Sequence, residues 1–163
     1  MMRAFVFLAL LCMAACSSNK KESVSTVAEA PERNELPPLQ VTLVTGERVM
    51  VNSLPGNTIL IFYNPDCDHC QREAKAISGQ LEAFKNYSLY FIAPGAMEEM
   101  NRFASAYGLS GFSNVRFAQT EVADVIRLMG PFPTPSLYIY SSGKRLVKKF
   151  NGETDVDEIV KFL

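Results

Sequence analysis

Hydrophobic positions recur along residues 39–163 with the two periods that distinguish strands from helices. Residues 39–44 and 48–51 alternate between apolar and polar side chains around the turn Thr45-Gly46-Glu47, which predicts a β-hairpin. Strands are also predicted over 58–63, 87–93, 114–118, 137–140 and 145–150, and helices over 68–85, 97–107, 120–129 and from 154 onward. This alternation predicts an α/β fold, with a central mixed β-sheet flanked by helices and an extra N-terminal hairpin.

The last two predicted helices have recognisable starts and inward faces. Thr120 and Thr154 are expected to cap them, because a hydroxyl group satisfies a free N–H group at the start of a helix. Spacings of three and four residues predict the inward-facing side chains, namely Val122, Val125, Ile126 and Met129 in one helix and Val156, Ile159, Val160 and Phe162 in the other. Residues 39–163 therefore suffice for one domain with its own core.

The N-terminus has the pattern of an export signal. A short positive region ending at Arg3 precedes an apolar stretch from Ala4 to Ala15, which is too short to span a bilayer. The small residues before Cys16 resemble a bacterial lipoprotein signal, although Met13 stands where that pattern prefers leucine. The resemblance implies cleavage before Cys16 and a lipid on that cysteine. An ordinary secretory signal or an uncleaved anchor is the alternative.

Three segments are therefore predicted: a signal peptide over 1–15, a flexible tether over 16–38, and a folded domain over 39–163. The tether is rich in Ser, Lys, Glu, Ala and Pro, a composition typical of flexible linkers. We expect the domain to be lipid-anchored on the periplasmic side of a bacterial membrane. No aspartate follows Cys16, which mildly favours the outer membrane.

Charge and cysteine content narrow the function. The 163 residues carry a net charge of −1 without a basic patch, which argues against binding nucleic acid. Cys12 lies within the signal and Cys16 would carry lipid, so Cys67 and Cys70 are the only thiols left in the domain. One close pair in an exported chain indicates a redox couple rather than a disulfide scaffold. We therefore expect no cofactor beyond a redox-active Cys67–Cys70 disulfide, and a monomeric protein.

The pair forms a C-x-x-C motif, Cys67-Asp68-His69-Cys70, where a buried strand is followed by a helix. The positive end of the helix stabilises a thiolate, the form that attacks disulfides. Cys67 is the expected nucleophile because it is nearer the helix start, and Cys70 is the expected resolving thiol. A zinc site is disfavoured because His69 is the only histidine and a site would have to recruit Asp66 or Asp68.

These features resemble the thioredoxin-like superfamily, in particular its membrane-tethered TlpA/ResA-like thiol-disulfide oxidoreductases, which implies a thioredoxin-like fold for residues 39–163. The resemblance rests on the hairpin, the run Phe62-Tyr-Asn-Pro-Asp-Cys67-Asp-His-Cys70, and Thr134-Pro135 before the strand over 137–140. It implies a cis peptide bond before Pro135, with Pro133 as the competing assignment. It also implies that Thr134 and Pro135 form a substrate groove, to which Phe132 is expected to contribute.

The same resemblance implies that His69 stabilises the thiolate and makes the couple oxidising. Asp66 and Asp68 act in the opposite direction, because a nearby negative charge disfavours a thiolate. The catalytic base stays unassigned: Ile61 occupies the position of thioredoxin's buried acid, and Ala96 that of the acid typical of the tethered branch. Glu98 or Glu99 is a possible substitute, although solvated carboxylates at a helix start are the more ordinary explanation.

The leading hypothesis is a lipid-anchored oxidoreductase outside the cytoplasm that reduces protein disulfides and is recharged by a membrane electron donor. One alternative is a peroxiredoxin-like peroxidase, although the run Asn64-Pro65-Asp66-Cys67 lacks the expected threonine. Another is a non-enzymatic copper-binding module, which the absence of a remote histidine disfavours. A fourth is an adhesion or assembly lipoprotein that uses the fold for binding alone.

Overall fold

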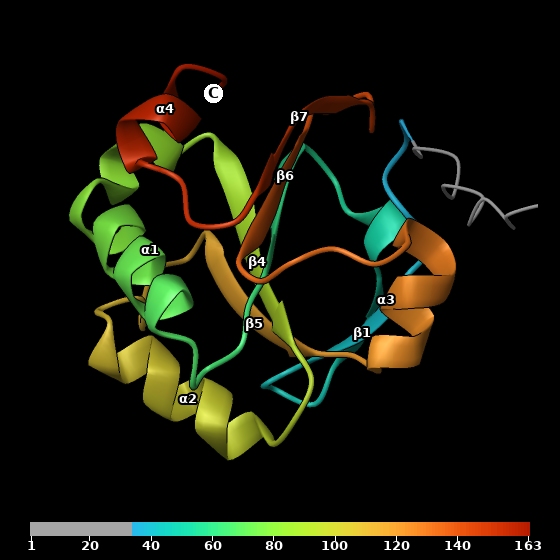
Figure 1. Ribbon diagram of the computed structural model, residues 1–163. Helices are drawn as coiled ribbons and strands as arrows, with labels where there is room; N and C mark the ends of the chain where they lie inside the picture. Colours follow the sequence, from blue (N-terminus) through green and yellow to red (C-terminus); the bar gives the residue numbers. More distant parts are fainter. Residues whose placement is uncertain (1–33) are drawn as a thin grey trace, which may run out of the picture.

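The computed structural model describes residues 34–163, so the signal peptide, most of the predicted tether and the lipidation of Cys16 lie outside the described residues. A seven-stranded sheet, in the order β2-β1-β5-β4-β3-β6-β7, forms the centre of the domain (Figure 1). Its strands are β1 (Gln40–Leu43), β2 (Arg48–Met50), β3 (Asn57–Phe62), β4 (Tyr87–Ala93), β5 (Val115–Gln119), β6 (Ser136–Tyr140) and β7 (Leu146–Asn151). The predicted mixed sheet with an N-terminal hairpin is confirmed.

The middle of the sheet is made by the two apolar runs that the sequence marks as buried strands. β3 pairs in parallel with β4 and antiparallel with β6, so that Ile59 lies between Leu89 and Ile139. All three side chains are fully buried, since helices cover both faces of the sheet at this point. The carboxyl end of β3, at Phe62, therefore emerges from the buried centre of the sheet.

Helices α1 (Asp68–Gly79), α2 (Met97–Ala106) and α4 (Val156–Val160) cover one face of the sheet, and α3 (Val122–Met129) covers the other (Figure 1). Two apolar clusters fill the spaces between these layers. The predicted helix over 68–85 is shorter than expected: α1 ends at Gly79, and the 3₁₀ turn η2 (Leu81–Phe84) follows. Glycine is a poor helix former, which favours this break.

The predicted inward face of α3 is partly wrong. Val125 and Leu128 are buried, whereas Val122 and Ile126 are about half exposed. Thr120 does not cap the helix, because its hydroxyl group donates to the carbonyl oxygen of Gln40 and Glu121 occupies the N-cap position. Pairing with β1 thus overrides the local capping preference and sets where the helix begins.

The start of α4 also differs from the prediction. Asp155, not Thr154, is the N-cap residue, and its carboxylate accepts a hydrogen bond from the N–H group of Asp157. The Thr154 hydroxyl group donates instead to the carbonyl oxygen of Gly152. Val156 and Ile159 are buried as predicted, but Phe162 lies beyond the helix and is partly exposed.

The packed domain begins before the predicted boundary at residue 39. The Leu146 N–H group donates to the carbonyl oxygen of Asn34 at 2.8 Å, and the Leu36 N–H group donates to that of Lys144 at 3.0 Å. Leu36 is buried in the core. These backbone contacts attach residues 34–36 to the start of β7, so the predicted tether cannot extend to residue 38. Within residues 34–163, no helix is both long and apolar enough to cross a bilayer.

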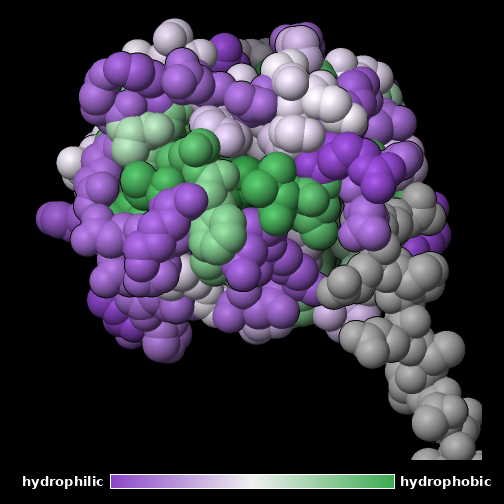
Figure 2. All heavy atoms as spheres, turned by 90° about the horizontal axis from the view of Figure 1, so that it is seen from above, coloured by the Kyte–Doolittle hydropathy of each residue, from purple (hydrophilic) through white to green (hydrophobic). Residues whose placement is uncertain are grey.

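A band of hydrophobic surface crosses the end of the molecule that lies at the top of Figure 1, where α4 and β7 meet (Figure 2). Val147 and Phe162 are the exposed large hydrophobic side chains that β7 and the C-terminal segment contribute. Lys148 covers part of this apolar surface, with its Nζ 4.8 Å from the centre of the Phe162 ring. Leu146 pairs with Tyr140, which pairs with Thr58 near the beginning of β3. Val147 therefore lies far from the carboxyl end of β3, where the cysteines are found.

Candidate active site

Cys67 is the N-cap residue of α1, reached from β3 through the short loop over 63–66. Its sulfur accepts a hydrogen bond from the Cys70 N–H group at 3.4 Å. An N-cap sulfur faces the free N–H groups of the first helical turn, which carry partial positive charge. The backbone thus supplies the electrostatic conditions for a reactive thiolate at the position predicted from the motif.

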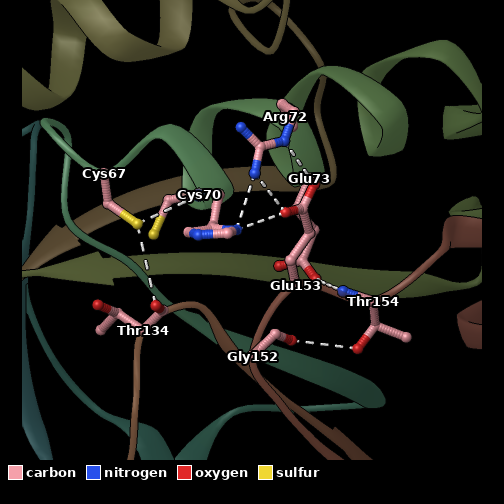
Figure 3. A network of polar contacts seen from close by, with 9 residues as sticks. Cys67, Cys70, Arg72, Glu73, Thr134, Gly152, Glu153 and Thr154 are labelled. Carbon is pink, nitrogen blue, oxygen red and sulfur yellow. Dashed lines mark hydrogen bonds and ion pairs between the residues drawn. The ribbon is translucent and has the colours of Figure 1, made fainter.

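The loop before β6 lies directly opposite Cys67 (Figure 3). The peptide bond between Thr134 and Pro135 is cis, as predicted, and Pro133 is not preceded by one. The Cys67 thiol group donates to the Thr134 carbonyl oxygen at 3.9 Å, a long contact that sulfur tolerates. Because Ser136 pairs with Phe62 across the sheet, the β3–β6 ladder places this loop beside the cysteines.

Cys70 lies one helical turn further on and is buried, while Cys67 is only half-buried. Both cysteines are free thiols. Burial raises the pKa of Cys70 to about 12, against a smaller lowering by the Asn64 N–H group, which donates to its sulfur at 3.5 Å. At neutral pH Cys70 is therefore protonated, and only Cys67 offers its sulfur to a partner.

Glu73 is a buried carboxylic acid that the sequence analysis did not identify. It lies three residues after Cys70, on the same inward face of α1, and accepts a hydrogen bond from the Thr154 N–H group at 3.0 Å. Burial raises its pKa to about 7; the bond from Thr154 opposes this shift, and the negative charge of Glu153 adds to it. The sequence could have revealed this buried acid, because Glu73 lies on the same face of the helix as Cys70, Ala74 and Ile77. Glu98 and Glu99, the substitutes considered, are solvent-exposed.

Asp66, Asp68 and His69 are the chain neighbours of the two cysteines. All three are exposed, and the two aspartates directly flank Cys67 in the chain. His69 does not stand alone, because its Nδ1 lies 2.6 Å from Glu153 Oε2. Arg72 joins the same group through two hydrogen bonds to Glu153 (Figure 3). Neither Arg72 nor Glu153 was identified from the sequence, and Glu153 is 84 residues from His69.

An apolar groove opens beside the loop that carries Pro135. Phe132 and Thr134 line it, and the exposed side chains of Val122 and Ile126 form part of its wall. The Phe132 ring packs against Phe62, with the ring centres 5.0 Å apart. Val122 and Ile126, which the helical pattern wrongly assigned to the core, therefore form an apolar wall of this groove.

The described residues contain no group of three or more His, Cys, Asp or Glu side chains that could hold a metal ion. Cys67 and Cys70 alone provide two sulfur ligands, fewer than structural zinc requires. The arrangement instead has an accessible thiol, a buried thiol in contact with it, and a neighbouring acid that titrates near neutral pH. These are the groups that a cycle between a dithiol and a disulfide uses.

The model of the AhpC/TSA family matches residues 33–148. No curated protein matches the chain. A secreted Mycobacterium tuberculosis disulfide oxidoreductase homologous to E. coli DsbE aligns with 21% identity and a TM-score of 0.64, over 76% of this chain and 92% of that one.

Two further solved structures share the fold. Bacillus subtilis StoA aligns with 13% identity and a TM-score of 0.59, over 76% of this chain and 93% of that one. Arabidopsis thaliana ScoI with copper bound aligns with 15% identity and a TM-score of 0.62, over 78% and 94%. These likenesses establish the thioredoxin-like fold.

Proposed function

The chain belongs to the AhpC/TSA family, and from this premise and the geometry of its two cysteines we propose that it is a thiol-disulfide oxidoreductase that reduces disulfides in protein substrates. One observation carries the proposal. Cys67 is accessible at a helix start and opposite the cis-proline loop, while Cys70 is buried one turn away with its N–H group on the Cys67 sulfur. This asymmetry assigns different tasks to the two thiols.

In the proposed reaction, the Cys67 thiolate attacks one sulfur of the substrate disulfide. A mixed disulfide forms, and the other substrate sulfur leaves as a thiolate. Cys70 then loses its proton and attacks the Cys67 sulfur, which forms the Cys67–Cys70 disulfide and releases the second substrate thiolate. Two electrons pass from the protein to the substrate, and both substrate sulfurs end as thiols after protonation.

We propose that Glu73 receives the proton of Cys70. A thiol with a pKa near 12 needs a base to react at neutral pH, and Glu73 is close enough that its charge contributes to raising that pKa. Its own pKa of about 7 leaves a substantial fraction ionised under these conditions. The hydrogen bond from Thr154 holds one carboxylate oxygen and leaves the other available.

The groove beside Thr134 supports a polypeptide as the substrate. Thr134, whose carbonyl oxygen accepts from the Cys67 thiol group, lines this groove together with the exposed side chains of Val122 and Ile126. An apolar residue near the substrate cysteine has a place to bind there, whereas a small hydrophilic disulfide gains nothing from it. Val122→Asp is therefore expected to raise KM for a protein disulfide about fivefold, since burial of the exposed half of the Val122 side chain contributes about 1 kcal/mol.

Val147→Asp is the matched control for this groove variant. Val147 is as exposed as Val122, at 49% against 50%, but lies near the beginning of β3, away from the cysteines. KM for the protein disulfide is measured by steady-state kinetics for both variants, with glutathione disulfide as a small substrate. Equal KM values for the two variants would exclude Val122 from substrate binding.

We also propose that the protein acts as a tethered member of the TlpA/ResA-like branch, lipid-anchored through Cys16 on the periplasmic side of a bacterial membrane. A membrane electron donor would then return the Cys67–Cys70 disulfide to the dithiol. The lipoprotein-like pattern at the N-terminus supports this proposal. The absence of an aspartate after Cys16 favours the outer membrane.

The proposed activity is tested by insulin reduction, followed as turbidity with dithiothreitol as the reductant. The purified protein is expected to accelerate precipitation of the reduced insulin chains. It is not expected to accelerate hydrogen peroxide consumption, because Asn64 stands where a peroxidase of this type has threonine. Rapid peroxide consumption with no effect on insulin would replace the proposal by the peroxidase alternative.

A copper-binding function has less support. The one observation in favour of this alternative is that the copper-bound ScoI structure shares the fold. The two cysteines, however, have no third His, Cys, Asp or Glu side chain grouped with them in residues 34–163. His69, the sole histidine of the chain, contacts Glu153 and Arg72 instead.

A further inference from the structure

The loop between β7 and α4 contacts both a buried and an exposed charged side chain of α1, next to the cysteine pair (Figure 3). On the buried side, the Thr154 N–H group binds Glu73. On the solvent side, the preceding residue, Glu153, binds Arg72 and His69 of α1. Two consecutive residues, more than 80 positions away in the chain, thus contact α1 within its first two turns.

Glu153 and Arg72 form a two-point ion pair. Arg72 Nε donates to Glu153 Oε1 at 2.8 Å, and Arg72 Nη2 donates to Glu153 Oε2 at 2.7 Å. Such paired hydrogen bonds fix the guanidinium group much better than a single surface contact does. The pair therefore has a defined position beside the helix start, although both side chains reach solvent.

His69 is held by the same two residues. Its Nδ1 lies 2.6 Å from Glu153 Oε2 and 2.8 Å from Arg72 Nη2. A protonated Nδ1 donates to the carboxylate, and an unprotonated Nδ1 accepts from the guanidinium group, so the ring has a partner in either state. The ring is therefore kept in place whatever its charge.

His69, Arg72 and Glu153 form a cluster whose charges act on Cys67. Arg72 has a raised pKa, chiefly because of its hydrogen bond to Glu153, and the negative charges of Asp68 and Cys67 contribute further. The same hydrogen bonds lower the pKa of Glu153 to about 2, so that its negative charge is constant at neutral pH. Arg72 therefore attracts the Cys67 thiolate, while Glu153 partly cancels that attraction.

We propose that Glu153 and Arg72 are positioning residues that together set the reducing strength of the Cys67–Cys70 couple: Arg72 favours the dithiol form, and Glu153 offsets that effect while holding Arg72 and His69 in place. This inference rests on the proposed function and deepens it. Asp68, which lies beside Cys67 and acts on Arg72, opposes Arg72 in the same way as Glu153.

Because Glu153 and Arg72 carry opposite charges, removal of each charge is expected to shift the redox equilibrium in the opposite direction. Glu153→Gln retains an oxygen that accepts from Arg72 but removes the negative charge, so the reduced form is stabilised. Its equilibrium constant with glutathione is expected to shift about threefold toward the dithiol, or about 14 mV for a two-electron couple. Arg72→Gln is expected to shift the constant by a similar factor toward the disulfide.

The experiment equilibrates the wild-type protein and each variant in glutathione buffers at pH 7 and quantifies the trapped dithiol. The pH profile of Cys67 alkylation is measured in parallel and should move to lower pH in Glu153→Gln and to higher pH in Arg72→Gln. Glu158→Gln is the control, since it breaks the exposed Glu158–Lys161 pair on α4 without touching the cluster. The double variant Glu153→Gln/Arg72→Gln should return close to the wild-type equilibrium.

Opposite shifts that cancel in the double variant support the inference, because a merely structural role gives no dependence on the sign of the charge. Shifts in the same direction, or shifts no larger than that of Glu158→Gln, overturn it. A wild-type protein that neither equilibrates with glutathione nor reduces insulin overturns the proposed function itself. A wild-type protein that cycles normally, with variants that do not differ from it, overturns this inference alone.

Discussion

Cys67→Ser is expected to lower the rate of insulin reduction by about two orders of magnitude or more, because it removes the nucleophile on which both steps depend. Cys70→Ser should lose turnover equally but keep the first step. Its Cys67 sulfur can still attack a substrate disulfide, and no second thiol then releases the product. The Cys70→Ser protein should therefore accumulate as a mixed disulfide with its substrate.

The mixed disulfide is measured on non-reducing gels and by intact mass after incubation with oxidised insulin. The double variant Cys67→Ser/Cys70→Ser controls for the other two cysteines of the chain, Cys12 and Cys16, and should form no adduct. An adduct with Cys67→Ser but not with Cys70→Ser would reverse the assigned roles. Such a reversal would also conflict with the burial of Cys70.

Glu73→Gln is expected to change both the pH dependence of stability and the rate. The pKa of Glu73 in the folded protein, about 7, lies above its ordinary value of 4.5, so the folded state binds a proton more tightly than the unfolded chain. Its contribution to stability is fully present below pH 4.5 and is lost as the pH rises through 7. The loss amounts to about 3 kcal/mol between about pH 4.5 and pH 8, from the size of the shift.

Urea unfolding at about pH 4.5, 6, 7 and 8 measures this effect. The wild-type protein should lose stability across that window, and Glu73→Gln should lose about 3 kcal/mol less, since its side chain does not ionise. The amide oxygen of the introduced glutamine can still accept from the Thr154 N–H group, which preserves the native contact. Glu153, whose pKa is lowered to about 2 in the folded protein, is present in both proteins, so its contribution cancels in the comparison. Parallel wild-type and variant profiles would contradict the assignment of a buried titrating acid.

The same variant should slow insulin reduction at pH 7 by about 100-fold, the lower end of the effect of a positioned base. Formation of the mixed disulfide by Cys67 should be much less affected, because Glu73 acts on Cys70. A single-turnover experiment separates the two steps. If the first step alone is slowed, Glu73 does not serve as the proton acceptor of Cys70.

Features set by local sequence were predictable. The buried strands β3 and β4 and the C-x-x-C motif at the start of α1 each have a signal within a few residues, whereas the cis bond before Pro135 was expected from the resemblance to the thioredoxin-like superfamily. The register between β3 and β6 brings the cis bond and the cysteines together, an arrangement that the same resemblance implied.

Features set by contacts between distant segments were not predictable. The outward position of Val122 and Ile126 depends on how α3 follows β5, and helical periodicity alone assigned both residues to the core. The hydrogen bond to Glu73 and the ion pair of Arg72 both come from the β7–α4 loop, 81 residues away. An acid on an inward helix position was visible in the sequence, but the loop that holds it was not.

The burial of Cys70 also affects how the protein exchanges electrons with its partners. Of the two cysteines in residues 34–163, Cys70 is buried and Cys67 is accessible, so under the proposed function a substrate and an electron donor would have to use the same small area of surface, one after the other. Neither can react while the other is docked, and each would inhibit the other competitively at high concentration. Under the proposed function, the protein is thus a shuttle with a single docking site, and its throughput depends on how quickly each partner leaves as well as on how quickly its sulfurs react.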